Sequence, residues 1–243
     1  MKEKNVTGAG AGAAAARAVA LAGATGLVGR VILEGLLADP TVAAVHALGR
    51  RAPGVSHPKL TPHVLDFGAL PPLPPLDEVY LALGTTIKAA GSQAAFRAVD
   101  FDANLSAARA ALAAGARRAG LVSAAGADAK SRIFYNRVKG ELEEALAQLP
   151  FEGLVVARPS LLVGDRKALG QPERTAERVA TAVTRLLGPL VPANYRPVAA
   201  SAVARALLAR VPTARGQVVL PSGEMRDAAA PRARESRPPT PAA

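Results

Sequence analysis

Two side chains four residues apart, Tyr135 and Lys139, form the pair in this chain best suited to move a proton. They lie in a stretch with helical periodicity, so the two side chains are neighbours on one helix face. A phenol exchanges protons poorly at neutral pH, but a cation beside it stabilises the phenolate. Ser123 precedes Tyr135 by 12 residues and follows an apolar run, a place from which its hydroxyl can orient a carbonyl oxygen. The three residues are therefore candidates for acid–base chemistry on a carbonyl group.

A glycine motif, Gly-x-x-Gly-x-x-Gly, occupies residues 23 to 29. It follows the apolar run Val19 to Ala22, which is typical of a strand, and precedes apolar residues at helical spacing. Glycine permits a tight turn, a close approach of the backbone to a pyrophosphate, and packing of helix on strand. The amides and dipole of the helix N-terminus attract phosphate. A plain turn is the alternative; as a dinucleotide loop, the motif offers Gly23, Thr25, Gly26, Leu27, Val28 and Gly29.

Strand and helix patterns alternate through much of the chain. Apolar runs predict further strands at 42–48, 63–67, 79–83, 119–122 and 154–157, and helical periodicity predicts long helices at 94–114 and 133–149. Strands separated by helices favour a parallel, doubly wound sheet with right-handed crossovers. The predicted fold class is therefore α/β, with the glycine motif directly after its first strand.

The ends of the predicted strands supply the remaining candidates, because open α/β sheets bind ligands outside the carboxyl ends of their strands. The second strand ends in Gly49-Arg50-Arg51. An acid there accepts hydrogen bonds from a ribose 2′-hydroxyl, whereas an arginine accommodates a 2′-phosphate. Two arginines and no acid favour NADP over NAD, although arginines that only solvate a loop give the same pattern. The predicted cofactor site also includes Asp66, Phe67, Leu83, Gly84, Thr85, Tyr135, Lys139 and Pro159.

The chain divides into four predicted segments. Residues 1–17 are rich in Gly and Ala without an apolar period and predict a disordered extension, followed by a nucleotide-binding domain at 18–160. Residues 161–223 predict a small C-terminal substrate lobe, and the Pro- and Arg-rich residues 224–243 predict a disordered tail. The lobe contains two helical patterns and a late strand, at 174–187, 198–208 and 218–220.

Composition narrows the range of functions. The net charge of +11 would suit nucleic acid, but the arginines are scattered and aromatic residues make up only 3% of the chain. The absence of cysteine excludes thiolate metal sites and a thiol nucleophile, and the three histidines lack metal-ligand spacing. No apolar run approaches the roughly 20 residues that span a bilayer. We therefore expect no metal, and neither a membrane nor nucleic acid as partner. Arg17 interrupts any signal-like apolar core, so the expected location is cytoplasmic.

Together these motifs resemble the short-chain dehydrogenase/reductase family. The resemblance runs from about Val19 to Arg166, with the glycine loop, Ser123 and Tyr135-x-x-x-Lys139 in the family's order and spacing. Four stretches are similar, more narrowly, to the atypical branch that contains the human Tat-interacting protein of 30 kilodaltons and its bacterial relatives. They are Leu83-Gly-Thr-Thr-Ile-Lys88, Ser123-Ala-Ala-Gly-Ala-Asp128, Tyr135-Asn-Arg-Val-Lys-Gly140 and Arg158-Pro-Ser-Leu-Leu162.

The resemblance implies a Rossmann-like fold, NADP binding, and hydride transfer from nicotinamide to a small carbonyl substrate. It makes Tyr135 the general acid and Ser123 the ligand of the carbonyl oxygen, while Lys139 stabilises the phenolate and holds the nicotinamide ribose. One departure concerns an asparagine that supports a proton relay in fuller members of the family. Asp100 stands at its place, and Asn104 follows one turn on.

Two functional hypotheses follow. The first is an NADP-dependent oxidoreductase acting on a small carbonyl compound, which the set of Ser123, Tyr135 and Lys139 supports. The second is a regulator or assembly factor that binds NADPH and a protein partner without turnover, as the branch resemblance suggests. Isomerisation or epimerisation of a nucleotide sugar is a third, weaker candidate, because the predicted lobe is short for so large a ligand. A homodimer through the alanine-rich helices at 94–114 and 133–149 stays open.

Overall fold

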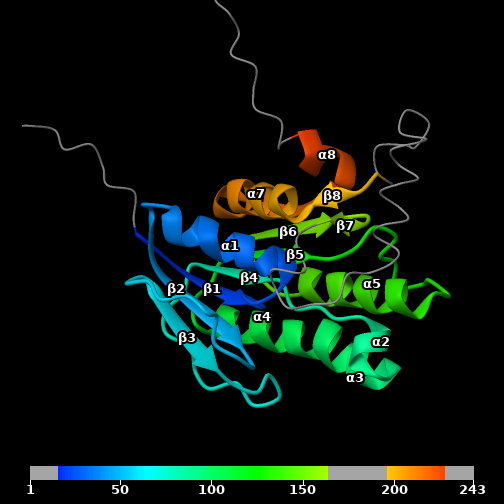
Figure 1. Ribbon diagram of the computed structural model, residues 1–243, viewed down its shortest axis with the longest axis horizontal. Helices are drawn as coiled ribbons and strands as arrows, with labels where there is room; N and C mark the ends of the chain where they lie inside the picture. The colour runs from blue at the N-terminus through cyan, green and yellow to red at the C-terminus, as the bar shows by residue number, and fades with distance from the viewer. Residues whose placement is uncertain (1–15, 164–195, 228–243) are drawn as a thin grey trace, which may run out of the picture.

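The computed structural model describes residues 16–163 and 196–227. A seven-stranded sheet with strand order β3-β2-β1-β4-β5-β6-β9 lies between two layers of helices (Figure 1), and every neighbouring pair of strands is parallel. The strands are β1 Arg17–Ala22, β2 Val42–Gly49, β3 Leu60–Val64, β4 Glu78–Leu81, β5 Arg118–Val122, β6 Gly153–Arg158 and β9 Gly216–Pro221. The predicted doubly wound, Rossmann-like fold is confirmed.

The helices cover both faces of the sheet. On one face lie α1 Leu27–Ala38 and α7 Ala200–Arg210, and on the other lie α4 Asn104–Ala113 and α5 Phe134–Ala147 (Figure 1). The shorter elements are α2 Ile87–Ala90, α3 Gln93–Arg97, the π-helix Ala98–Ala103, β7 Leu162–Val163, β8 Val198–Ala199, the 3-10 helix Val211–Thr213 and α8 Ser222–Asp227. Strands buried on both faces lose the alternation of polar and apolar residues, and β4 is buried throughout.

Two predicted elements differ from the structure. The third strand, expected at 63–67, is Leu60–Val64, because this edge strand exposes most of its residues and so lacks the apolar run of a buried strand. Pro62 is tolerated there, since an edge strand leaves one row of backbone groups unpaired. The single helix expected at 94–114 is instead α3, the π-helix and α4 in succession. The π-helix buries Asp100, a polar residue that helical periodicity places poorly.

Residues expected in a separate lobe take part in the main layers. Strand β9 pairs with β6 in the main sheet, and α7 packs against α1, where a Cβ on Gly35 would lie 2.4 Å from Leu208 Cδ1. Helix α8 extends into the segment expected to be a disordered tail, and Met225 within it is buried. The helix predicted at 174–187 lies outside the described residues. In the part of the chain that the structure describes, we find no helix with the length and apolar character to cross a membrane.

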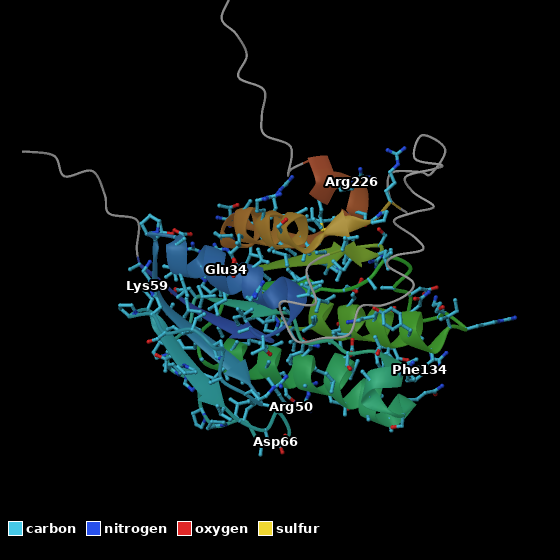
Figure 2. All side chains as sticks on the ribbon, in the orientation of Figure 1. Glu34, Arg50, Lys59, Asp66, Phe134 and Arg226 are labelled. Atoms are coloured by element: carbon cyan, nitrogen blue, oxygen red, sulfur yellow. The ribbon has the colours of Figure 1, made fainter. Side chains whose placement is uncertain are left out.

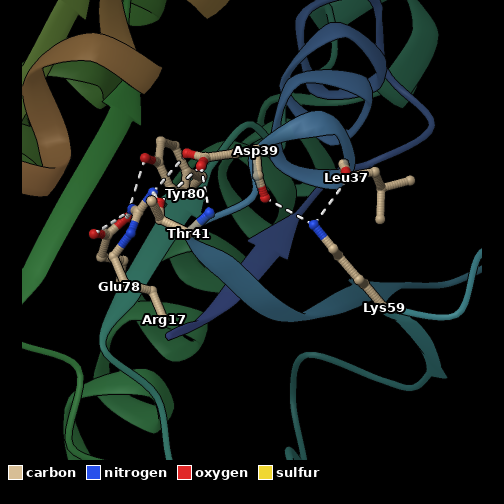
Figure 3. Close-up of polar contacts among 7 residues, drawn as sticks. All are labelled: Arg17, Leu37, Asp39, Thr41, Lys59, Glu78 and Tyr80. Carbon is tan, nitrogen blue, oxygen red and sulfur yellow. Dashed lines mark hydrogen bonds and ion pairs between the residues drawn. The ribbon is translucent and has the colours of Figure 1, made fainter. Parts of the chain in front are cut away.

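A polar network closes the amino edge of the sheet, where β1, β2 and β4 begin (Figure 3). Arg17 donates from Nη1 to both Glu78 carboxylate oxygens, each at 2.7 Å, and from Nη2 to Asp39 Oδ2 at 2.8 Å. The Tyr80 hydroxyl donates to Glu78 Oε2 at 3.2 Å. Burial and the nearby Glu78 carboxylate raise the pKa of Tyr80 well above its ordinary value. Partial burial alone would raise the pKa of Asp39, but the hydrogen bonds from Thr41 and the charges of Arg17 and Lys59 together lower it.

Candidate functional site

The glycine motif forms a tight loop between β1 and α1. Gly23 has φ +91°, which L residues rarely adopt, and a Cβ there would lie 2.6 Å from the Ala82 carbonyl. A Cβ on Gly29 would lie 2.0 Å from the Gly23 oxygen, so the first turn of α1 packs against the loop only because Gly29 has no side chain. Gly26 caps α1, and its amide donates to the Gly23 oxygen at 3.0 Å. The start of α1 therefore faces the space above the carboxyl edge of the sheet.

A cavity of about 660 Å³ occupies this space, a volume within the usual range of small-molecule sites. Its walls come from the glycine loop, the ends of β2 and β4, the segment after β3, and the π-helix with the start of α4. Figure 2 labels Arg50 and Asp66 near one another below the ends of the sheet strands. The predicted cofactor residues that line the cavity are Gly23, Thr25, Gly26, Arg50, Arg51, Asp66, Phe67, Leu83, Gly84 and Thr85.

Other predicted residues lie outside this lining. Leu27, Val28 and Gly29 belong to the first turn of α1, and Val28 is buried in the core. The Pro159 carbonyl accepts a hydrogen bond from the Ala125 amide at 2.7 Å, which joins the end of β6 to the loop after β5. Sequence reasoning did not single out Ala98, Val99, Asp102, Ala103 and Ser106, which also line the cavity. The only feature of the sequence that connects these residues is their spacing, which places them on one face of a helix.

Helix α5 carries Tyr135 and Lys139 beside this region. A Cβ on Gly140 would lie 2.1 Å from the Ala129 amide nitrogen, so the loop after β5 presses directly on α5 at the turn that holds Lys139. The Tyr135 ring packs at a tilt on Phe96 of α3, with ring centroids 5.5 Å apart. Among the described residues, the Tyr135 hydroxyl has no hydrogen-bond partner, and Tyr135 is not one of the residues that line the cavity.

Lys139 is buried and paired. Its Nζ lies 2.7 Å from Asp100 Oδ1, and the other Asp100 oxygen accepts a hydrogen bond from the Thr85 amide at 2.8 Å. A Cβ on Gly84 would lie 3.9 Å from Lys139 Nζ and 3.5 Å from Asp100 Oδ1. Gly84 and Thr85 line the cavity, so the ion pair lies directly behind its wall.

Ser123 has a hydrogen-bond partner within the protein. Its hydroxyl donates to Glu143 Oε1 on α5, and the side chains of Ser123 and Glu143 are buried. Arg158, at the end of β6, donates to the same carboxylate from Nε and Nη2, at 2.6 to 3.1 Å. This hydrogen bonding with Glu143 raises the pKa of the Arg158 guanidinium. Sequence reasoning missed Glu143; its signal was its position two turns after Tyr135 and one turn after Lys139 on one helix face.

Comparison with curated proteins identifies the family to which the chain belongs. It is 40% identical over 180 residues to the mitochondrial protein fmp52 of Emericella nidulans, a match that covers 70% of this chain and 76% of the relative. It belongs to the Fmp52 family. A second Fmp52 protein, FMP52-1 of Scheffersomyces stipitis, is 36% identical over 155 residues, or 60% of this chain and 67% of the relative. The chain matches no protein-family model.

These relatives overturn the expected location. They are named mitochondrial, which contradicts the expectation of a cytoplasmic protein. The physical reason is that an α/β core of this kind has the same composition in either compartment. The interrupted apolar core argued only against a secretory signal peptide, and it did not test targeting to other compartments.

Solved structures share the fold. An oxidoreductase of the short-chain dehydrogenase/reductase family from Burkholderia thailandensis superposes with a TM-score of 0.61 at 20% identity, covering 86% of this chain and 93% of its own. The enzyme WbmH of Bordetella bronchiseptica, solved in complex with NAD+, superposes with a TM-score of 0.61 at 17% identity, covering 85% of this chain and 76% of its own. The Rossmann-like fold of the short-chain dehydrogenase/reductase type is therefore shown.

Proposed function

We propose that this Fmp52 family member is an NADP-dependent oxidoreductase that reduces a small carbonyl compound. One observation carries the proposal: the Lys139 ammonium lies directly behind Gly84, in the wall of a cavity that begins at a glycine phosphate loop. A dinucleotide laid from that loop along the strand ends brings its far end toward α5. The neighbours that are solved with NAD are consistent with a nicotinamide cofactor.

The residues at the two ends of the cavity fit such a cofactor. The glycine loop leaves a cradle that a Cβ on Gly23 or Gly29 would fill, and the start of α1 offers its dipole to phosphates. Arg50 and Arg51 are exposed in the lining after β2, where a 2′-phosphate would lie. Asp66 shares this lining, and its Oδ1 already accepts a hydrogen bond from the Gly68 amide at 3.0 Å. The arginines therefore favour NADP over NAD.

The proton chemistry is assigned to α5. Bound NADPH supplies a hydride to the carbonyl carbon. The Tyr135 hydroxyl donates a proton to the carbonyl oxygen, and the Lys139 ammonium stabilises the resulting phenolate. The tilted Phe96 ring holds the Tyr135 ring in place from the side. We also infer that the chain is related to the Tat-interacting protein branch, because four stretches of its sequence are similar to that branch.

A second candidate is a regulator that binds NADPH and a protein partner without turnover. The observation that favours it is the Ser123 hydroxyl, which donates to Glu143 and so is already committed within the protein. A carbonyl substrate would have to compete with this carboxylate for Ser123. The two candidates share the cofactor and differ in whether a carbonyl is consumed.

A titration of the purified protein with NADPH and, separately, with NADH distinguishes these candidates. Nicotinamide fluorescence reports binding, and a panel of aldehydes, ketones and quinones then reports oxidation. Tight NADPH binding with turnover supports the reductase, and tight binding without turnover across the panel supports the regulator. If neither nucleotide binds, both candidates are wrong and the glycine motif is a structural turn.

A further inference from the structure

The ion pair of Lys139 joins the helix that carries it to the cavity wall. The Lys139 and Asp100 side chains are 5% and 1% exposed. Asp100 Oδ1 has no hydrogen-bond partner in the described part of the chain, so its 2.7 Å contact with Lys139 is held by charge rather than by hydrogen-bond geometry. Asp100 Oδ2 accepts from the Thr85 amide. One carboxylate thus contacts both α5 and the loop after β4.

The backbone around Asp100 is fixed as well. Asp100 lies in a π-helix, a form that occurs often at functional sites. The Asn104 amide nitrogen donates to the carbonyls of Leu83, Val99 and Asp100, at 3.1 to 3.3 Å. These bonds attach the π-helix to the end of β4. The carboxylate therefore cannot move away from Lys139 without breaking contacts on both sides.

We propose that Asp100 is a positioning residue that fixes the Lys139 ammonium behind the cavity wall and offsets its charge at Tyr135. The proposal rests on the proposed function in taking Tyr135 as the proton donor. In general, a cation beside a phenol favours the phenolate, and a carboxylate close to that cation, as Asp100 Oδ1 is to Lys139 Nζ at 2.7 Å, opposes this effect. The charge that Tyr135 experiences is consequently that of the pair and not of Lys139 alone.

Two other carboxylates on this part of α5, those of Glu143 and Glu141, are already paired. Glu143, one turn beyond Lys139, is bound by the Ser123 hydroxyl and by Arg158 of β6. On the outer face, Glu141 pairs with Arg97 of α3, at 31% and 40% side-chain exposure, and lies 3.9 Å from Arg137. Exposed pairs act weakly through solvent. Asp100 is therefore the carboxylate whose removal changes the field of Lys139.

The pairing itself is tested first, by chemical denaturation of the wild type, Asp100→Asn, Lys139→Met and the double variant. Lys139→Met leaves a buried carboxylate without its cation and should lower the denaturation midpoint clearly. Adding Asp100→Asn removes that charge and should restore at least half of the loss. A double variant no more stable than Lys139→Met would overturn the pairing, and this readout needs neither cofactor nor turnover.

The effect on Tyr135 is tested by following phenolate absorbance during an alkaline titration. The chain has three tyrosines, so the signal of Tyr135 is obtained by subtracting the Tyr135→Phe form of each variant. Asp100→Asn retains an oxygen for the Thr85 amide and is expected to move the phenolate signal of Tyr135 to lower pH, whereas Lys139→Met is expected to move it to higher pH. The control Glu144→Gln removes an exposed carboxylate from the same helix and should leave it unchanged.

The outcomes separate this proposal from the proposed function. An unmoved Tyr135 titration in a folded Asp100→Asn protein overturns the positioning role, even if the wild type reduces carbonyls. A lowered titration supports it, even if no carbonyl on the panel is reduced. In an active protein, the alkaline limb of the kcat profile should move in the same direction, a change that a purely structural residue would not cause.

Discussion

The two edges of the central sheet carry similar types of charged residue, but the residues are arranged differently. At the amino edge, one arginine joins two carboxylates, and a tyrosine hydroxyl donates to one of them (Figure 3). At the carboxyl edge, the Lys139–Asp100 and Arg158–Glu143 pairs are as close, and the Lys139–Asp100 pair lies behind Gly84, in the wall of a cavity of about 660 Å³. Each region also has a tyrosine, Tyr80 in the amino-edge network and Tyr135 on α5, the helix that carries Lys139. Tyr80 is bonded and fully buried, whereas the Tyr135 hydroxyl is without a partner in the described structure.

This difference teaches how buried charge can serve stability in one place and chemistry in another. In a buried network in which every group has a partner, the groups do not readily exchange protons with a ligand. Burial and the Glu78 carboxylate also raise the pKa of Tyr80, so its hydroxyl keeps its proton. A hydroxyl without a partner inside the protein can exchange its proton with a bound ligand. The amino edge should therefore affect folding only, and the carboxyl edge should affect binding and turnover.

The largest expected effect is that of Tyr135→Phe at the carboxyl edge. It removes the proton donor and keeps the ring that packs on Phe96, so turnover should fall about 10²- to 10⁴-fold. NADPH affinity and the denaturation midpoint should stay at wild-type values, because no described contact of the hydroxyl is lost. Steady-state kinetics and nucleotide fluorescence measure the two quantities. Activity retained by this variant would remove Tyr135 as the acid.

The amino edge predicts the opposite pattern for Glu78→Gln. The Glu78 carboxylate is fully buried and binds Arg17 with both oxygens, so its neutralisation should lower the free energy of unfolding by about 3 kcal/mol. Urea denaturation measures the loss, and NADPH affinity of the folded protein should not change. The matched control Glu34→Gln breaks an exposed pair with Arg30 and should cost less than about 1 kcal/mol. A selective loss of NADPH affinity in Glu78→Gln would break the comparison.

A smaller effect is expected from Arg50→Ser/Arg51→Ser, which tests nucleotide choice. Both arginines line the cavity after β2, and charged hydrogen bonds to a phosphate contribute about 1.5 to 3 kcal/mol. Affinity for NADPH should fall about 10- to 100-fold and affinity for NADH should fall much less. The control Arg205→Ser/Arg210→Ser removes the same charge from exposed positions on α7. An equal loss for the two nucleotides would leave no basis for preferring NADP.

How far the sequence predicts these edges depends on the kind of signal each one leaves. The carboxyl edge was predictable in outline, because a parallel sheet places strand ends together and the glycine spacing marks the first of them. The partner of Ser123 was not, since Glu143 reads as an ordinary charged residue of α5 until β6 brings Arg158 beside it. At the amino edge, Arg17 and Glu78 are 61 residues apart, and no local pattern links them. Contacts between distant residues need the fold first.

Between the two edges, β2 and β3 hold a histidine pair whose effect should be the smallest. His46 Nδ1 and His63 Nε2 lie 3.0 Å apart, and partial burial together with the facing His63 lowers the pKa of His46. The unfolded chain therefore binds a proton at a pH at which the folded chain does not. Stability is full above about pH 6.5 and should decrease as the pH falls below that value.

The measurement is the urea midpoint at pH 7.5 and 5.5 for the wild type and His46→Gln. The wild type should lose more stability on acidification than the variant, by less than about 1 kcal/mol. This window lies above the titration of Asp39, whose pKa is lowered, so Asp39 stays charged throughout. If both proteins lost the same stability between pH 7.5 and 5.5, the acid sensitivity would belong to a group other than His46.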